Sequence, residues 1–293
     1  MPLRSLRLTT CASLACALLP LSGCSTSQLV ARGASPLIEH GMAAMNRETD
    51  LELARASIPA NLKMIEALLL ADPGNVAYRV QAAIGFHGYA LGFVEPGDRV
   101  RATALYQRAR DHALVALERA GLPQAMLAGD MAALQQALAK LGARAVPALF
   151  WAASAWAKWI ELQLDDPARL DELPRVELLM QRVLALDETY YHGGAHVFFG
   201  VYYGGRAPMF GGDFARAARH FDRAAEIGQG RLLMGEVYRA RYLLRQTGDR
   251  TAFHATLQRV LDAPPAGDPE LNLANALARQ EAAVLLNQEE DLF

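Results

Sequence analysis

The sequence predicts an all-α fold made of successive helical hairpins, and three observations support this prediction. Alanine and leucine dominate the 293 residues, and β-branched residues form no alternating runs of the kind that strands require. Prolines fall mainly between apolar segments, as at Pro73, Pro167 and Pro269, where one helix can end and the next begin without the loss of interior hydrogen bonds. The chain also repeats itself internally, as helical-hairpin arrays do.

The internal repeat relates segment 72–109 to segment 187–224 by a shift of 115 residues without a gap. The identical pairs are Asp72 and Asp187, Gly85 and Gly200, Gly97 and Gly212, Asp98 and Asp213, Arg101 and Arg216, Ala102 and Ala217, Arg108 and Arg223, and Ala109 and Ala224. Asp98 and Asp213 stand where an N-cap accepts the free N–H groups of a starting helix. Small residues flank Tyr106 and Phe221 at the spacing typical of the second helix of a tetratricopeptide repeat.

We therefore expect a degenerate tetratricopeptide-like array, an α-solenoid or bundle of helical hairpins in one continuous domain. An irregular helical bundle with chance self-similarity is the alternative. Each hairpin is expected to bury one central anchor residue, and these anchors follow one another at uneven spacings. The expected anchors are Met64, Tyr106, Leu138, Met180, Phe221 and Leu257.

The N-terminus has the features of a lipoprotein signal peptide. Arg4 and Arg7 precede an uncharged Leu- and Ala-rich run that is too short to span a bilayer permanently. The run ends at Leu21-Ser22-Gly23-Cys24, which resembles the bacterial lipobox, so we expect cleavage before Cys24 and acylation of its thiol. An ordinary cleaved signal followed by a chance cysteine is the alternative. Acylation with two or three chains anchors a protein stably.

These features divide the chain into three parts. Residues 1–23 are the expected signal peptide, 24–36 the lipidated cysteine with a flexible tether, and 37–293 a single helical domain. In the lipoprotein sorting rule that this sequence resembles, aspartate after the cysteine retains a protein in the inner membrane, so Ser25 favours the periplasmic side of the outer membrane. The remaining cysteines, Cys11 and Cys16, leave with the signal peptide, so the mature domain has neither disulfide nor thiolate chemistry.

The composition and motifs argue against an enzymatic function and against nucleic-acid binding. The formal net charge is −2, and no basic block stands out, so nucleic acid is not an expected partner. The chain has no phosphate-binding loop, dinucleotide fingerprint or nucleophile elbow. His192 and His196 have the spacing of helical zinc ligands, but Gly193 and Gly194 lie between them, and capping or packing explains them better. We expect a protein that is not an enzyme, with no metal and no cofactor.

Two kinds of apolar segment remain without an assigned role. The turns 91–96 and 204–211 are equivalent under the repeat and carry more apolar residues than exposed connections usually do. They either fold back on the core or meet a partner or ligand. Trp151, Trp156 and Trp159 share somewhat less than half the circumference of one helix, which fits either a buried central helix or an aromatic wall facing an internal passage.

The sequence resembles the T component of tripartite ATP-independent periplasmic (TRAP) transporters, a family of lipoproteins with tetratricopeptide-like repeats. The resemblance covers nearly the whole mature chain and depends on the order and spacing of several segments together. These segments are 58–62, LLLADP at 68–73, LYQRAR at 105–110, PALFWAA at 147–153, GGAHVFFGVYY at 193–203, 273–278 and 291–293.

The resemblance implies a homotrimer of perforated protomers that docks a periplasmic substrate-binding protein, the P component, and binds or conducts a small hydrophobic or organic-acid ligand. The membrane is contacted through the lipid anchor only. From aromatic content we expect the following residues to line the ligand passage: Trp151, Trp156, Trp159, Tyr202, Tyr203 and Phe210, with Arg206 as an anion contact at a mouth. Alternatively, the protein is an outer-membrane scaffold lipoprotein whose repeat surface binds another protein in envelope assembly.

Overall fold

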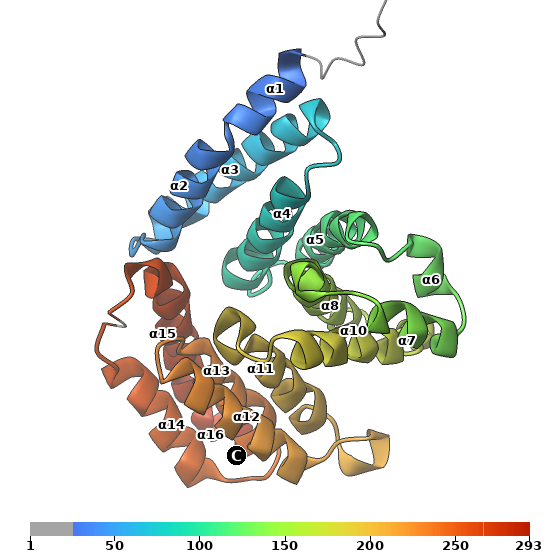
Figure 1. The fold of residues 1–293 in the computed structure, drawn as a ribbon. Coiled ribbons are helices and arrows are strands. Elements are labelled where there is room, and N and C mark those ends of the chain that lie inside the picture. The colour runs from blue at the N-terminus through green and yellow to red at the C-terminus, as the bar shows by residue number, and fades with distance from the viewer. Residues whose placement is uncertain (1–25, 266) are drawn as a thin grey trace, which may run out of the picture.

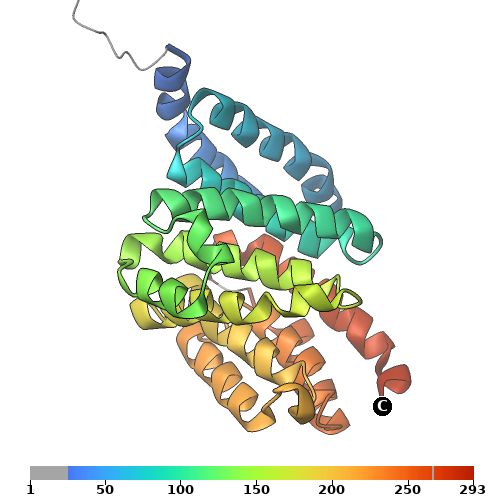
Figure 2. The ribbon, with the colours of Figure 1, turned by 90° about the vertical axis from the view of Figure 1, so that its right-hand side faces the viewer.

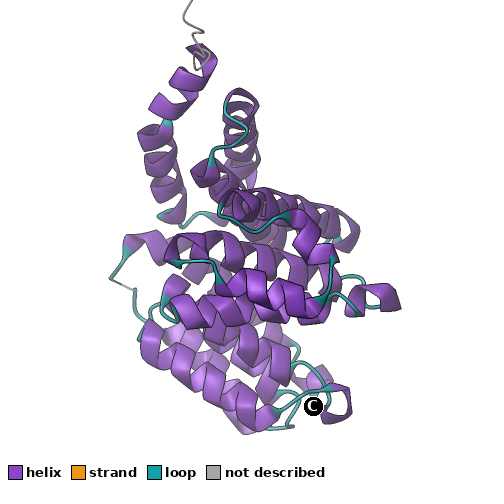
Figure 3. Ribbon diagram, turned by 45° about the vertical axis from the view of Figure 1, so that its right-hand side comes forward, coloured by secondary structure: helices purple, strands orange, loops and turns teal. Residues whose placement is uncertain are grey.

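The computed structural model describes residues 26–265 and 267–293, and every regular element within these residues is helical (Figure 3). The predicted all-α class is therefore confirmed. The more specific tetratricopeptide-like arrangement stays a prediction. The signal peptide and Cys24 lie outside the described residues.

The helices of the first half precede the tryptophan-containing helix α8. They are α1 (Thr26–Gly33), α2 (Ser35–Asn46), α3 (Leu51–Ala71), α4 (Val76–Tyr89), the π-helix η1 (Ala90–Val94), α5 (Arg99–Arg119), α6 (Gln124–Ala128), α7 (Met131–Ala139) and the 3₁₀ turn η2 (Ala143–Ala145).

The second half runs from α8 to the C-terminus. Its elements are α8 (Val146–Glu161), α9 (Pro167–Leu170), α10 (Leu173–Leu186), α11 (Tyr190–Gly204), the 3₁₀ turn η3 (Pro208–Phe210), α12 (Phe214–Gly228), α13 (Met234–Arg239), the π-helix η4 (Ala240–Leu244), α14 (Arg250–Asp262), the 3₁₀ turn η5 (Pro269–Leu271), α15 (Asn272–Asn287) and α16 (Glu289–Leu292).

Successive helices pack against one another as stacked layers (Figure 2). The principal packed pairs are α3 with α4, α4 with α5, α5 with α8, α8 with α10, α11 with α12, and α14 with α15. Both halves of the internal repeat therefore form helical hairpins, α4–α5 and α11–α12. Their second helices begin at the expected N-caps: Asp98 accepts the N–H of Arg101 at 2.9 Å, and Asp213 accepts that of Arg216 at 2.8 Å.

Most of the expected anchors are buried in the core. Tyr106, Leu138, Met180, Phe221 and Leu257 are buried, whereas Met64 is 57% exposed, so its assignment as an anchor is wrong. The buried residues of α3 are Ala54, Ile58, Leu62, Ile65 and Leu69, and Met64 lies off this stripe. Among the described residues, the two hydrophobic core clusters span residues 54–285.

Residues 26–36, expected to be a flexible tether, are instead helical in α1 and at the start of α2. Buried contacts explain the difference. Ala31 is buried, and its carbonyl accepts a 2.5 Å hydrogen bond from the Tyr78 hydroxyl. Arg32 and Gln28 both donate to the carboxylate of Asp72 at the end of α3. The flexibility expected from the Ser- and Gly-rich composition is removed by tertiary packing.

The N-terminal and C-terminal ends of the array touch each other. In Figure 1, α15 lies beside the end of α2 that leads into α3. Asn272 at the start of α15 donates to the backbone carbonyl of Arg47 at 3.3 Å, and the Arg47 guanidinium contacts the Glu270 carboxylate at 3.4 Å. The helices therefore form a closed arrangement, in which elements more than two hundred residues apart share one wall.

Candidate functional site: an apolar cavity between the two ends of the array

A cavity of about 850 Å³, partly open to solvent, lies between the walls of this arrangement. Its walls come from both halves of the chain, because α2, α3, α4 and η1 face α8, α11, α13, η4 and α15 across it. Most of its lining is apolar, including Ile65, Ile84, Leu91, Phe198 and Leu277. Met42, Met45 and Met234 add flexible side chains that can adapt to differently shaped ligands. The volume falls in the range of small-molecule sites, which run from about 300 to 1,000 Å³.

A left-handed turn at the start of α11 forms part of the cavity wall. Tyr191, His192 and Gly193 have φ values of 50°, 57° and 78°. Gly193 is required here, because a Cβ would also lie 3.3 Å from the Cα of Ala224. Tyr191 and His192 adopt the same conformation at a cost of roughly 1–2 kcal/mol each, and both line the cavity. Backbone strain of this kind gathers at functional sites.

One ionic network is buried at the cavity wall. The Lys158 ammonium lies 2.8 Å from Glu95 Oε1 and 2.8 Å from Glu161 Oε2. Tyr106 donates to the other oxygen of Glu95, and Tyr242 to that of Glu161. Burial alone would lower the pKa of Lys158, but the charge of Glu161 and the other neighbours outweigh burial and raise that pKa above its ordinary value. The network thus joins η1, α5, α8 and η4 around one ammonium and two carboxylates.

Three of the seven residues predicted to line a passage do line this cavity: Trp151, Tyr202 and Arg206. Trp151 donates to the Tyr190 hydroxyl at 3.3 Å and packs edge-on against Tyr191. Arg206 stacks on Tyr202, with its Cζ 3.8 Å from the ring centroid, and donates through Nε to the Tyr202 carbonyl at 2.9 Å. Burial and a hydrogen bond to Glu177 raise the pKa of Tyr202 to about 12.

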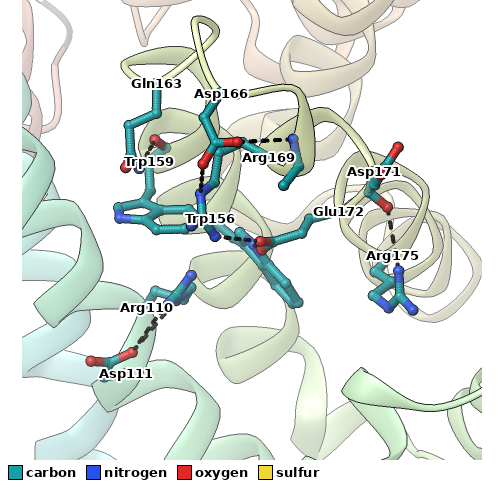
Figure 4. Close-up of polar contacts among 11 residues, drawn as sticks. Arg110, Asp111, Trp156, Trp159, Gln163, Asp166, Arg169, Asp171, Glu172 and Arg175 are labelled. Carbon is teal, nitrogen blue, oxygen red and sulfur yellow. Dashed lines mark hydrogen bonds and ion pairs between the residues drawn. The ribbon is translucent and has the colours of Figure 1, made fainter.

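Trp156 and Trp159 point away from the cavity, contrary to expectation. Trp159 lies between two guanidinium groups, with Arg110 Cζ 4.3 Å and Arg169 Cζ 4.7 Å from its ring, and Trp156 donates to Glu172 at 2.6 Å (Figure 4). The side of α8 that faces the cavity includes Ser154. At 100° per residue, Trp156 lies roughly 200° and Trp159 roughly 140° around the helix from Ser154, so both tryptophans are on the opposite side of α8. The apolar sequence of α8 reflects burial on all sides.

Tyr203 and Phe210 also lie outside the cavity lining. Tyr203 is buried between α11 and α12, where Arg216 Cζ lies 4.0 Å from its ring centroid. Phe210 on η3 is 69% exposed, and its neighbour Met209 is 82% exposed. The two equivalent turns therefore differ: segment 91–96 folds back with Phe93 buried, whereas segment 204–211 presents apolar side chains to solvent.

The two histidines with zinc-like spacing have separate environments. His192 lies in the left-handed turn, whereas His196 Nδ1 is 3.0 Å from His220 Nδ1 and its Nε2 is 3.0 Å from Glu188. Across the described part of the chain, no three His, Cys, Asp or Glu side chains gather as a metal site requires. Among residues 26–265 and 267–293, no helix has both the length and the hydropathy needed to cross a membrane.

The His196–His220 pair predicts a pH dependence of stability. Burial, followed by the charge of His196, lowers the pKa of His220 to about 4, against an ordinary value of about 6.5. Between these two pH values the unfolded chain binds a proton that the folded chain does not, so stability falls as the pH decreases through this range. Between pH 7 and pH 5, the urea concentration at the midpoint of unfolding should decrease less in His220→Phe than in the unmodified protein.

His40→Gln, at an exposed position on α2, is the control, and it should follow the unmodified protein. If the unfolding midpoint decreases equally in His220→Phe and in the unmodified protein, His220 does not contribute to the pH dependence of stability.

Sequence reasoning singled out the apolar segment 91–96, which includes Leu91 and Phe93 of the cavity lining, but it did not identify the contributions of α4, α13 and α15. Their lining residues are ordinary apolar side chains, and only the tertiary arrangement separates them from the core. The glycine pair Gly193-Gly194 was the one local signal of unusual backbone, and the strained turn lies there. The helices and the cavity that they line define an all-α protein with a large, mostly apolar cavity that is partly open to solvent.

Comparison of the sequence with models of known protein families identifies the family within this all-α class. The family model of the TRAP transporter T-component matches residues 47–293, so the chain belongs to this family. The chain is also similar to an uncharacterized protein of Treponema pallidum (strain Nichols), with 25% identity over 262 residues that cover 84% of this chain and 81% of that protein. Family membership makes the protein an accessory component of a TRAP transporter and implies association with other transporter components.

Proposed function

We propose that this T component binds or conducts a small hydrophobic or organic-acid ligand and docks the substrate-binding P component. The observation that carries the proposal is the apolar cavity of about 850 Å³, whose walls come from both ends of the array. A protein that served only as a scaffold would have no need of such an internal space. The family also does not favour the scaffold alternative. The proposal assigns the protein no catalytic step, cofactor or metal.

The proposal places the protein on the periplasmic side of the outer membrane as a homotrimer anchored through acylated Cys24. The membrane contact is the lipid alone. Helix α1 supports a defined orientation, because Gln28 and Arg32, a few residues after Cys24 in the sequence, hold it to Asp72 at the end of α3. The anchor would therefore be joined to the folded domain through only a short connection.

The exposed turn 204–211 is the better of the two candidate docking turns, because Met209 and Phe210 face solvent while Phe93 does not. The test is capture of the P component from periplasmic extract on immobilised segment 26–293, with mass-spectrometric identification. We expect a TRAP substrate-binding protein to be captured, and a variant with both Met209→Ser and Phe210→Ser to lose it.

The control variant changes two other exposed apolar residues, Leu70→Ser and Val100→Ser, and should retain capture. If only outer-membrane assembly or cell-wall proteins are captured, the transport proposal is wrong and the scaffold alternative gains support.

A further inference from the structure

Helix α1 places polar side chains toward the protein and apolar side chains toward solvent. Gln28 and Arg32 both donate to the carboxylate of Asp72, at 2.8 Å and 3.0 Å. Leu29 and Val30 instead face solvent and are 68% and 66% exposed. The apolar side of a surface helix in a globular protein normally packs against the core. The reversed arrangement in α1 is the pattern expected of a helix that meets an apolar surface outside the domain.

The exposed apolar residues of α1 continue as a row into α2. Ala34, between the two helices, keeps an α-helical conformation with φ −80° and ψ −6°, and α1 and α2 follow one another along one edge of the molecule (Figure 1). The residues of the row are spaced four apart, so they lie along one face, and all of them are exposed. They are Leu29, Gly33, Leu37 and Gly41.

The sequence around this row contains little charge. Segment 26–38 has one ionisable side chain, Arg32, and its guanidinium is paired with the carboxylate of Asp72 at 3.0 Å. The transfer of a charged group out of water is costly unless the group is paired. The row can therefore enter an apolar environment without leaving an unpaired charge there.

The lipid anchor identifies the membrane as the apolar surface. In the proposed function Cys24 is acylated, so its acyl chains lie in the bilayer. Thr26, the first residue of α1, follows Cys24 by two residues, which span about 7 Å when fully extended. The headgroup layer of one leaflet is about 5–8 Å thick. The anchor would therefore hold the start of α1 at or within this layer.

We propose that the face of α1 and α2 that carries Leu29, Val30 and Leu37 lies in the headgroup layer of the membrane, with the exposed row along the bilayer surface. Amphipathic helices bind membranes in this way, with their apolar side chains inserted as far as the acyl boundary. The inference rests on the acylation of Cys24 in the proposed function. It also goes beyond that function, because the acyl chains are then no longer the only contact with the membrane, and the domain has a fixed orientation on its anchor.

The test measures the depth of two positions in the row. The complete chain is expressed in bacteria, and the processed, acylated protein is reconstituted into vesicles of phosphatidylethanolamine and phosphatidylglycerol. Gly33→Cys and Gly41→Cys are each labelled with nitrobenzoxadiazole, because a Cβ at either position meets nothing within 4 Å. The native cysteines do not compete, because Cys11 and Cys16 leave with the expected signal peptide and the thiol of Cys24 is acylated. Quenching by a lipid with a nitroxide headgroup reports how close each label lies to the membrane surface.

The two orientations of the helices predict different quenching. Upright helices would place position 41 about 12 Å farther from the membrane than position 33, because an α-helix rises about 1.5 Å per residue. We expect instead equal quenching at both positions, at least about threefold stronger than at Val100→Cys, because the headgroup layer is thin. Val100 is 84% exposed, and it lies on α5, which α3 and α4 separate from α2 (Figure 1).

Replacement of the apolar side chains tests whether they cause the contact. A variant with three serines should lower the quenching at position 41 to the level at position 100, while the acyl chains keep the protein on the vesicles. Its changes are Leu29→Ser, Val30→Ser and Leu37→Ser. The control variant changes three exposed apolar residues of α3 and should leave the quenching unchanged. Its changes are Leu53→Ser, Met64→Ser and Leu70→Ser.

Four results would overturn the inference. If position 41 is quenched as little as position 100, the lipid alone holds the protein, and only this inference is overturned. The same conclusion follows if the variant with serines at positions 29, 30 and 37 is quenched as strongly as the unmodified row. Blue-shifted emission of the labels without quenching would assign the face to another protein surface, such as a second copy of this chain. If the processed protein does not float with the vesicles, the acylation in the proposed function fails, and this inference fails with it.

Discussion

Replacement of Lys158 by methionine is expected to lower the free energy of unfolding by about 2–3 kcal/mol at pH 7, less than for a fully buried pair, because Glu161 is partly exposed to solvent. The variant removes the ammonium that neutralises Glu95, whose side chain is 17% exposed, and Glu161, whose side chain is 36% exposed. Methionine fills a similar volume, so the loss reports mainly the uncompensated charge. In the unmodified protein the pKa of Glu161 lies below its ordinary value, because Lys158 outweighs the effect of burial.

The pH dependence gives this prediction its sign. Burial by itself raises the pKa of Glu161, and without Lys158 less opposes this effect, so protonation of Glu161 at lower pH relieves part of the destabilisation. The difference in urea midpoint between Lys158→Met and the unmodified protein should therefore shrink from pH 7 to pH 4.5. Addition of Glu161→Gln to the variant should restore part of the stability. Lys140→Met, at an exposed position, is the control and should change stability little.

If the difference in urea midpoint between Lys158→Met and the unmodified protein stays constant from pH 7 to pH 4.5, this account of the ionic network is wrong.

Trp159→Ala is expected to destabilise the protein by about 3–5 kcal/mol. It should not weaken binding of N-phenyl-1-naphthylamine, an uncharged fluorescent reporter of apolar cavities. The substitution empties a buried site between Arg110 and Arg169 and removes two cation–π contacts (Figure 4). Trp151→Ala should instead weaken reporter binding, because Trp151 lines the cavity and its ring packs against Tyr191.

The measurements are urea unfolding followed by far-ultraviolet circular dichroism, and reporter titration at a temperature where each variant is folded. Trp159→Phe is the conservative variant and should recover much of the stability. If folded Trp159→Ala no longer binds the reporter, Trp159 lines the ligand passage after all, and its purely structural role is wrong.

Local features of the fold could be predicted from the sequence with good detail. The aspartates at positions 98 and 213 cap helices as expected, because an N-cap depends only on residues within one turn. Met64 and segment 26–36 could not be assigned correctly from local pattern. The burial of a given helix face and the ordering of α1 both depend on residues distant in sequence, such as Asp72 and Tyr78.

The candidate site could be predicted only in part, for a related reason. Aromatic content identified Trp151 and Tyr202, but the same criterion selected Trp159, Tyr203 and Phe210, which have other environments. A tryptophan at the cavity and one in the core look alike in a sequence, because both follow from an apolar helix. The lining residues of α13 and α15 have no local signature either, since their place at the cavity depends on the tertiary arrangement.

The contact between Arg47 and the segment Glu270–Asn272 has a consequence for the order of folding. In an open solenoid each repeat meets only its neighbours, so folding can begin anywhere and spread. Here the last wall of the cavity comes from residues synthesised more than two hundred positions after α2. An emerging chain that stops at residue 265 lacks η5 and α15, and the cavity is open on that side. The capacity to enclose a ligand therefore arises late, as a slow, non-local step, and belongs to the finished chain rather than to any single hairpin.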